Sequence, residues 1–292
     1  MQTVIPNVKK SVLKQKNYMA NLTRPLLIYH GGKWNLAPWI LSYMPSHKIY
    51  VELFGGGGSI LLRKKRSYAE IYNDLDSEIV NLFSVVRDRG GELINKLIYT
   101  PYSRNEYEYS FKKTDDPLEL ARRTVVRSFF GFGNTAVLYS EGDSRPGFRA
   151  VVRTSGSYPA SIWRVYTDAL AAIIERLRGV TIENKDAFDL ILAQDSKDTL
   201  FYADPPYLPS TRDKGNDYRF EMTEAEHIEL AKRLNKTKGA VMVSGYHSKL
   251  YDELYKDWEK REKKTQTFQN NERTEVLWLK DCNTEYDLFE RA

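Results

Sequence analysis

The stretch Ile49-Tyr-Val-Glu-Leu-Phe-Gly-Gly-Gly-Gly-Ser-Ile-Leu-Leu-Arg63 decides the fold class of this chain. Its apolar beginning, 49–54, predicts a buried strand. The four glycines at 55–58 predict a tight loop, and the residues from Ser59 onward predict a helix. The sequence therefore predicts a strand, a glycine loop and a helix in direct succession.

The same rhythm continues on both sides of a long interruption. Further strands are predicted at 69–73, 180–183, 199–203, 240–244 and 275–279, and further helices at 77–87 and 223–235. From about 90 to 179 the pattern is mostly helical, with helices expected at 117–130 and 162–177. We therefore predict an α/β fold with a largely parallel sheet and one inserted, mostly helical domain.

The predicted organisation has three parts. Residues 1–20 form a basic arm, 21–89 and 180–292 together form the α/β domain, and 90–179 form the insert. A chain of 292 residues is long enough for one large domain with an insertion, or for two modest ones. The arm has lysines but lacks the apolar stretch of a signal peptide.

Composition excludes several classes of protein. No apolar run approaches the length needed to cross a bilayer. The single cysteine, Cys282, cannot form an internal disulfide or a cysteine-built zinc site, so we expect a reducing, cytoplasmic location and no metal. The net charge of +5 favours a phosphate-rich partner weakly.

The strongest single motif is Asp204-Pro-Pro-Tyr207, directly after the apolar strand at 199–203. Asp204 offers a carboxylate and Pro205 a carbonyl, and the consecutive prolines fix the backbone that carries these two acceptors. The Tyr207 ring offers a flat face on which a base can stack. This arrangement suits an aromatic amine, whose two N–H bonds must be held; a rigid turn is the structural alternative.

The glycine loop and Asp74 favour a cofactor that carries a nucleoside. Glycines let a ligand approach the backbone closely, and an acidic side chain at the end of the next strand can hold ribose hydroxyls. The spacing of a dinucleotide fingerprint fails at Ile60 or Leu61, and the phosphate-binding loop of an ATPase is absent.

Several pieces in this order resemble the Dam-like family of DNA adenine-N6 methyltransferases, over roughly 26–280. The pieces are Tyr29-His-Gly-Gly-Lys33, Glu52-Leu-Phe-Gly-Gly-Gly-Gly-Ser59, Asn73-Asp-Leu-Asp76, Glu183-Asn-Lys-Asp186 and Asp204-Pro-Pro-Tyr207. One departure is Leu53, where the family often has proline before the aromatic residue.

The resemblance implies a Rossmann-like methyltransferase sheet with helices on both faces, and S-adenosylmethionine as cofactor. Tyr29 would pack against this cofactor, Lys33 would meet its carboxylate, Asp74 its ribose, and Asp186 or its neighbours its adenine. The implied cofactor-binding residues are Tyr29, Lys33, Glu52, Phe54, Gly55, Gly57, Ser59, Asp74, Asp186 and Asp204, and the implied catalytic residues are Asp204, Pro205, Pro206 and Tyr207. Taken singly, Lys33 would be a surface cation, Tyr29 a core aromatic and Asp186 a helix cap.

The insert would read duplex DNA through a basic face. The predicted DNA contacts are Arg122, Arg123 and Arg127 on the helix at 117–130, and Asn134, Arg145 and Arg149 after it. A solvated, charged helix face is the alternative for any one arginine. Asn134 is followed by Thr135, not by the glycine of relatives that read GATC, so that target is not carried over.

The sequence thus predicts a DNA adenine-N6 methyltransferase, site-specific or relaxed in specificity, acting as a monomer or weak dimer. Two alternatives stay open: methylation of a base amine in RNA, and a DNA-binding protein that has lost catalysis. Two further basic clusters, 63–66 and 260–264, are interpreted as solubilising surface.

Overall fold

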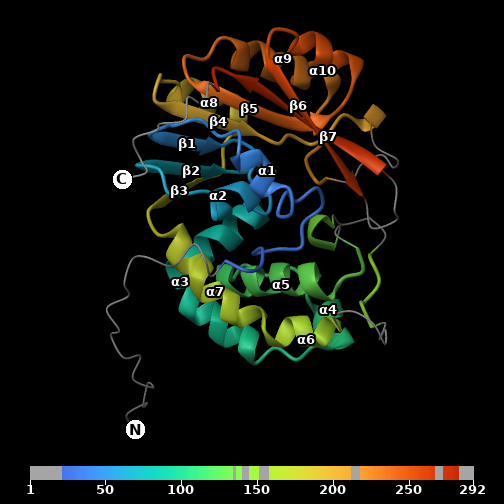
Figure 1. Ribbon diagram of the computed structural model, residues 1–292. Coiled ribbons are helices and arrows are strands. Elements are labelled where there is room, and N and C mark those ends of the chain that lie inside the picture. Colours follow the sequence, from blue (N-terminus) through green and yellow to red (C-terminus); the bar gives the residue numbers. More distant parts are fainter. Residues whose placement is uncertain are drawn as a thin grey trace.

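The computed structural model describes residues 22–133, 136–139, 145–150, 158–211, 218–266 and 272–282, so the predicted arm at 1–20 lies outside it. Its centre is a seven-stranded sheet in the order β3-β2-β1-β4-β5-β7-β6 (Figure 1). The strands are β1 (Ile49–Glu52), β2 (Ala69–Asn73), β3 (Val180–Glu183), β4 (Thr199–Ala203), β5 (Ala240–Tyr246), β6 (Glu259–Gln266) and β7 (Glu272–Lys280).

Most neighbouring strands are parallel. β1 pairs in parallel with both β2 and β4, and the pairs β2–β3 and β4–β5 are parallel as well. β7 runs antiparallel to its neighbours β5 and β6. The prediction of an α/β fold with a largely parallel sheet is confirmed.

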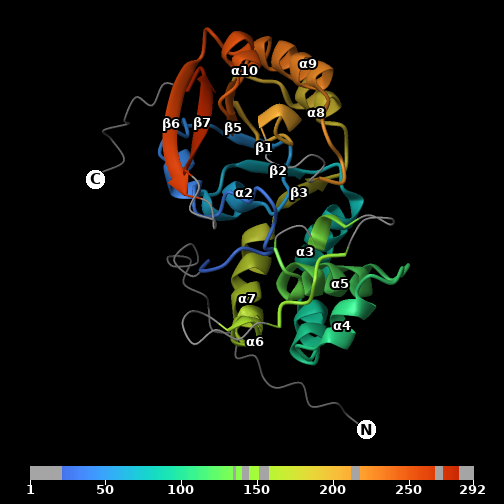
Figure 2. The ribbon, with the colours of Figure 1, turned by 90° about the vertical axis from the view of Figure 1, so that its right-hand side faces the viewer.

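Helices cover both faces of this sheet, as predicted. They are α1 (Ala37–Leu41), α2 (Ser59–Arg63), α3 (Ser77–Ile98), α4 (Arg104–Tyr109), α5 (Pro117–Phe130), α6 (Pro159–Arg164), α7 (Tyr166–Leu177), α8 (Ala187–Gln194), α9 (Glu224–Asn235) and α10 (Lys249–Leu254). Helices α8, α9 and α10 gather on one side, and α3 to α7 lie together at the other end of the molecule (Figure 2). No helix in the described ranges is both long and apolar enough to span a membrane.

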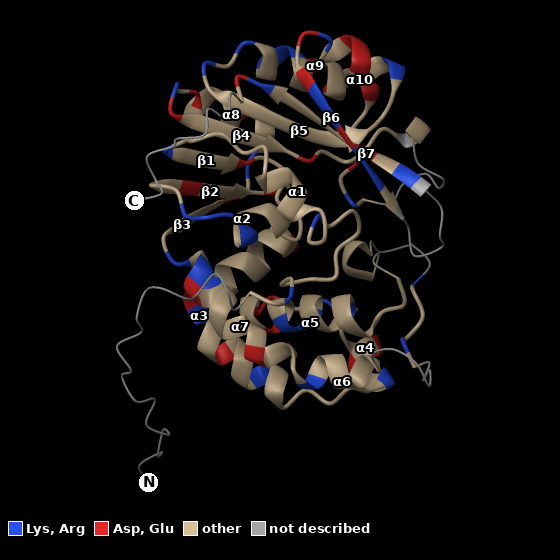
Figure 3. Cartoon of the chain, in the orientation of Figure 1, with Lys and Arg blue, Asp and Glu red and all other residues tan. Residues whose placement is uncertain are grey.

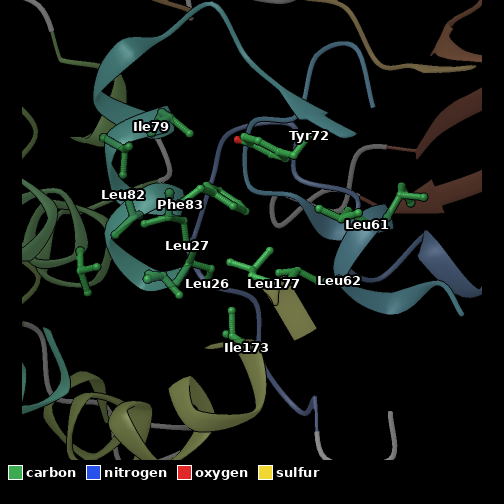
Figure 4. Packing of buried hydrophobic residues seen from close by; sticks show 14 of the residues in the cluster. Leu26, Leu27, Leu61, Leu62, Tyr72, Ile79, Leu82, Phe83, Ile173 and Leu177 are labelled. Carbon is green, nitrogen blue, oxygen red and sulfur yellow. The ribbon is translucent and has the colours of Figure 1, made fainter. Parts of the chain in front are cut away.

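Alternating strand residues enter two separate cores. Tyr50, Tyr72 and Tyr202 belong to the core on the side of α2, α3 and α7. Their strand neighbours Val51, Ile71 and Ala203 belong to the core under α8, α9 and α10. This is the period-two pattern of a sheet buried on both faces. Figure 4 shows the first core, where helices α2, α3 and α7 meet the segment before α1 at Leu61, Leu62, Ile79, Leu82, Phe83, Ile173, Leu177, Leu26 and Leu27.

Helix α3 joins the sheet to the predicted insert. It runs past the predicted boundary at residue 90 and continues to Ile98, with non-helical backbone angles at Arg89. Helices α5 and α7 pack along it, and their buried side chains belong to the same core cluster as the sheet. The insert therefore shares its hydrophobic core with one face of the sheet.

Strand β6 was missed by the sequence analysis because its side chains are almost all charged. Its residues read Glu-Lys-Arg-Glu-Lys-Lys-Thr-Gln, and it forms the edge of the sheet beside β7. Charged side chains at a sheet edge oppose pairing with another chain, and Figure 3 shows both signs along this strand. The interpretation of 260–264 as surface agrees with the exposure of 261–264, while Lys260 is half-buried.

The basic cluster at 63–66 is only partly surface, contrary to the sequence analysis. Lys64 is buried and pairs with Glu70 at the start of β2. Arg176 of α7 reaches the same carboxylate through two contacts, at 2.6 and 2.9 Å, and donates to the Leu61 carbonyl at 2.6 Å. Arg176 thus fixes the last helix before β3 to both β2 and α2.

Arg176→Met should lower the free energy of unfolding by about 3 kcal/mol, because it breaks a buried charge pair and leaves the Leu61 carbonyl without this donor. Urea titration measures the change. The matched control is Arg178→Met, which removes a largely exposed arginine with 70% side-chain exposure, and it should stay within about 0.5 kcal/mol of the wild type. Equal effects of the two substitutions would contradict this role.

Candidate active site

One open cavity of about 1110 Å³, including space open to solvent, lies at the carboxyl ends of β1, β2 and β4. The segments that follow these strands contribute to the lining of the cavity. Phe54 and the glycine turn, the loop at 55–58, follow β1, Asp74 follows β2, and Asp204 follows β4. Strand order reverses between β1 and β4, and this is where ligands bind in open parallel sheets. The cavity is therefore the candidate active site.

The glycine turn lies directly on two stacked rings. Tyr72 and Phe83 stack with centroids 4.0 Å apart, and a Cβ at Gly55 would come within 2.1 Å of the Tyr72 ring. Gly58 has a φ of 63°, and a Cβ there would lie 2.8 Å from Phe83. Packing beneath the turn requires glycine at both positions, and at Gly58 the backbone angle requires it as well.

Glu52 supports the turn from below. Its buried carboxyl accepts from the Tyr50 hydroxyl and from the Leu61 backbone N–H, both at 2.8 Å. Burial raises the pKa of Glu52 to about 8, despite these hydrogen bonds. Glu52 also lines the cavity, and its hydrogen bonds fix helix α2 to the sheet.

Asp74 holds the other end of the turn. One carboxylate oxygen accepts from the Gly56 N–H at 2.7 Å and the other from the Asp76 N–H at 2.8 Å. Burial raises the pKa of Asp74 to about 6, against the stabilising effect of these backbone donors. An acidic group in this position presents hydrogen-bond acceptors to a ligand in the cavity.

Asp204 is held from two sides. The ammonium of Lys33 lies 3.1 Å from Oδ2, and the Ser244 hydroxyl donates to Oδ1 at 2.8 Å. Burial by itself lowers the pKa of Lys33, but attraction to Asp204 and Glu275 outweighs burial and raises this pKa. Lys33 is buried, so the interpretation as a surface cation is wrong.

Ser244 was not predicted from the sequence as a site residue. It is buried in β5, next to β4, and its hydroxyl also contacts the Tyr202 hydroxyl at 2.9 Å. The only local signal was its place at the end of a predicted strand. Its role depends on the pairing of β4 with β5, which brings it beside Asp204.

Tyr207 has a different environment from the one predicted. Its ring is buried, its hydroxyl donates to Glu275 at 3.0 Å, and Tyr246 packs against it edge-on at 4.5 Å. The Lys33 ammonium lies 4.6 Å from the ring centroid. In this conformation the ring is not an open stacking face, because Glu275 of β7 and its other neighbours hold it inside the protein.

The remaining predicted cofactor residues line the same cavity. The Tyr29 ring packs against Gly56 and Gly57, and Ser59 and Asp186 line the cavity. Asp186 also caps helix α8, since its side chain accepts from the Phe188 N–H at 2.7 Å. Pro206 lines the cavity next to Asp204. The structure thus brings together residues that are far apart in the sequence.

The predicted basic face on α5 does not exist. Arg122, Arg123 and Arg127 are all buried. Arg122 pairs with Glu106 and Glu119, both at 2.7 Å, and acidic segments lie beside the basic ones in Figure 3. Arg127 contacts Glu78 and donates to the Ser110 carbonyl at 2.6 Å. These arginines fix helices α3, α4 and α5 together, so the prediction of an exposed basic face was wrong.

The other predicted DNA contacts lie beyond α5. Asn134 is outside the described residues. Arg145 is exposed and lies over the rings of Phe111 and Tyr139, at 5.1 and 5.5 Å from their centroids. Arg149 is half-buried, and its backbone N–H donates to the Phe130 carbonyl at 2.7 Å.

Comparison with known families agrees with this geometry. The D12 class of N6 adenine-specific DNA methyltransferases matches residues 29–270. The chain belongs to this class. It catalyses methylation of the N6 amino group of adenine in DNA. Of the two substrate classes that the sequence leaves open, DNA and RNA, the family selects DNA.

Named relatives extend over most of the chain. The DNA adenine methylase of Salmonella typhi is 23% identical over 80% of this chain and 84% of its own length. The corresponding protein of Haemophilus influenzae is 24% identical over 80% of this chain and 82% of its own. The type II methyltransferase M1.LlaDCHI of Lactococcus lactis is 26% identical over 84% of this chain and 88% of its own length.

Ser244→Ala should lower the kcat of this methyltransferase about tenfold, because a hydrogen bond to a charged group contributes about 1.5 kcal/mol or more. The KM for the cofactor should stay close to the wild-type value. Steady-state methyl transfer to DNA measures both constants. Ser42→Ala is the control, since Ser42 makes an exposed hydrogen bond to the Trp39 carbonyl; an unchanged kcat for Ser244→Ala would remove Ser244 from the site.

Proposed function

We propose that Asp204 and the Pro205 carbonyl hold the exocyclic amine of a target adenine at the mouth of this cavity, with S-adenosylmethionine bound along the glycine turn. The observation that carries the proposal is the position of Asp204. Its carboxylate, fixed by Lys33 and Ser244, lines the same cavity as Asp74 and the glycine turn. A target amine held by Asp204 would therefore face whatever the turn binds.

The chemistry of the cavity fits this cofactor. S-adenosylmethionine combines a nucleoside with an amino acid, and when bound it supplies an electrophilic methyl group. The cavity offers acidic acceptors at Asp74 and Asp186, a buried cation at Lys33, and aromatic rings at Tyr29 and Phe188. Lys33 would hold the carboxylate of the amino acid part and Asp74 the ribose hydroxyls.

Asp204 and Pro205 would align the amine. Each carboxylate oxygen has more than one lone pair, so Asp204 can accept an amine hydrogen while keeping its contacts with Lys33 and Ser244. Pro205 has a carbonyl but no N–H, and its ring restricts the backbone that carries this acceptor. The nitrogen loses a proton when it gains the methyl group, and the Asp204 carboxylate would accept this proton.

Most of the rate acceleration would come from positioning. Two acceptors that are fixed before the substrate arrives need little reorganisation as charge develops on the amine. The base must leave the duplex to reach the cavity, and Pro206 beside Asp204 gives that side of the cavity an apolar surface.

We assign recognition of the duplex to the part of the insert that follows α5. Arg145 is exposed and, together with Arg149, is suited to contact phosphates, which set the register on DNA but carry no sequence information. We propose relaxed or site-specific methylation of duplex DNA by a monomer or weak dimer.

Asp204→Asn should reduce kcat at least about 100-fold, because the amide replaces an acceptor oxygen with a donor group and loses the charge that takes the proton. Binding of S-adenosylhomocysteine should stay within about threefold of the wild type, since the glycine turn is unchanged. Transfer of a labelled methyl group to unmethylated plasmid DNA measures the rate. The control is Asp198→Asn, an exposed aspartate paired with Lys48; equal activity in both variants would refute the assignment.

Cofactor affinity should depend on pH through Asp74. Burial raises the pKa of this group to about 6, so the carboxylate is ionised above that pH and protonated below it. Protonation removes acceptor capacity, and the dissociation constant of S-adenosylhomocysteine should rise up to about tenfold per pH unit below the pKa. Equilibrium dialysis over a pH series measures the profile.

Asp74→Asn is the matched variant for this profile. It should bind more weakly at neutral pH, and its affinity should no longer fall in acid. A wild-type profile in Asp74→Asn would show that another group is responsible.

A further inference from the structure

Arg219 links two walls of the cavity. It belongs to the rim segment, residues 218–222, and every residue of this segment lines the cavity. Its guanidinium donates to both oxygens of Asp76, at 2.7 and 2.8 Å. It also donates to the carbonyls of Val137 and Tyr139, at 3.0 and 3.1 Å. One side chain therefore binds the start of α3 and a turn of the insert together.

The contact with Asp76 reaches the proposed ribose site. Asp76 is the N-terminal cap of α3, where its carboxylate accepts from the Glu78 N–H at 3.0 Å. Its own N–H donates to Asp74, whose second oxygen accepts from Gly56. A short chain of hydrogen bonds thus runs from Arg219 to the glycine turn.

The contact with the insert fixes a wall residue of the cavity. The 3₁₀ turn η2 (Ala136–Leu138) follows α5, and Leu138 lines the cavity. Arg219 binds the carbonyls on either side of Leu138. Because the wall includes this residue, the cavity is complete only when the insert is in place.

A second pair of charges supports Arg219. Glu78 of α3 lies 2.8 Å from its guanidinium, and Glu78 also contacts Arg127 and Thr124 of α5. The cluster thus combines two carboxylates with two guanidinium groups, and all four side chains are at most 19% exposed. Opposite charges of equal number make such burial tolerable.

We infer that Arg219 is a positioning residue that couples binding of duplex DNA on the insert to the affinity of the cofactor cavity. The inference rests on the proposed function, because it takes the cavity as the S-adenosylmethionine site and the insert as the part that binds duplex DNA. DNA that orders the turn at η2 orders Leu138, the rim segment and the start of α3 through the same guanidinium. By linkage, the cofactor then strengthens DNA binding by the same factor.

Lysine cannot replace Arg219 in this role. The guanidinium is a planar fork: one of its nitrogens donates to Asp76, and another donates to two backbone carbonyls. An ammonium group keeps the charge but not this geometry. Arg219→Lys therefore keeps the positive charge but should lose the coupling, whereas Arg219→Met should lose both.

The test measures binding of labelled S-adenosylhomocysteine by equilibrium dialysis, with and without unmethylated plasmid DNA. The ratio of the two dissociation constants is the coupling factor, and the wild type should show at least about a fivefold tightening by DNA. The factor should fall to about one in Arg219→Lys and Arg219→Met. In steady-state assays the KM for the cofactor at saturating DNA should rise in both variants while kcat changes less.

The control is Arg89→Met, which removes an exposed arginine paired with Glu92. It lowers the net charge by the same amount as Arg219→Met. It should keep the wild-type coupling factor. Thermal unfolding checks that each variant is folded; Arg219→Lys preserves the charge balance of the cluster and decides the question if Arg219→Met does not fold.

The outcomes separate this inference from the proposed function. A wild type that does not bind S-adenosylhomocysteine would refute the proposed cofactor site. A wild type that binds it without any effect of DNA, or an Arg219→Lys variant with the wild-type coupling factor, would overturn the role of Arg219 and leave the cofactor site standing.

Discussion

The parallel pairing of β1 with both β2 and β4 is the constraint on which the site depends. Glu52 lies opposite Tyr72 on one side and Tyr202 on the other, so the three strands end at the same level. The next residues of each strand leave the sheet together as the glycine turn, Asp74 and Asp204. A shift of one residue in either pairing would turn these groups toward the opposite face.

Aromatic packing sets the height of the glycine turn above the sheet. Tyr72 and Phe83 stack beneath it, and Gly55 and Gly58 allow the backbone to rest on their rings. Asp74 then fixes the turn from the side through the Gly56 N–H. The turn is therefore positioned by the core of the sheet and helix α3 before any ligand binds, which is the preorganisation that a binding site for a flexible cofactor requires.

Buried charges hold the parts of the molecule in register. Glu70 meets Lys64 and Arg176 where α7 joins the sheet, and Arg219 joins Asp76 to the turn at η2. Removing charges from water is costly, so such pairs contribute less to stability than to fixing one arrangement. In this protein they lie between the sheet and the helices of the insert.

The sequence by itself determined the strands and helices with clear periodicity, the order of the motifs, and the place of Asp204 and Asp74 at strand ends. These features are local, because periodicity, glycine and proline act on neighbouring residues. Only the tertiary structure decided that Arg122, Arg123 and Arg127 are buried. It also decided that Tyr207 is held by Glu275, that Ser244 donates to Asp204, and that Arg219 donates to Asp76. Those roles depend on partners that, in the hydrogen bonds of Ser244, Tyr207 and Arg219, lie 40, 68 and 143 residues away along the chain, and a side chain carries no local mark of a partner that only folding brings to it.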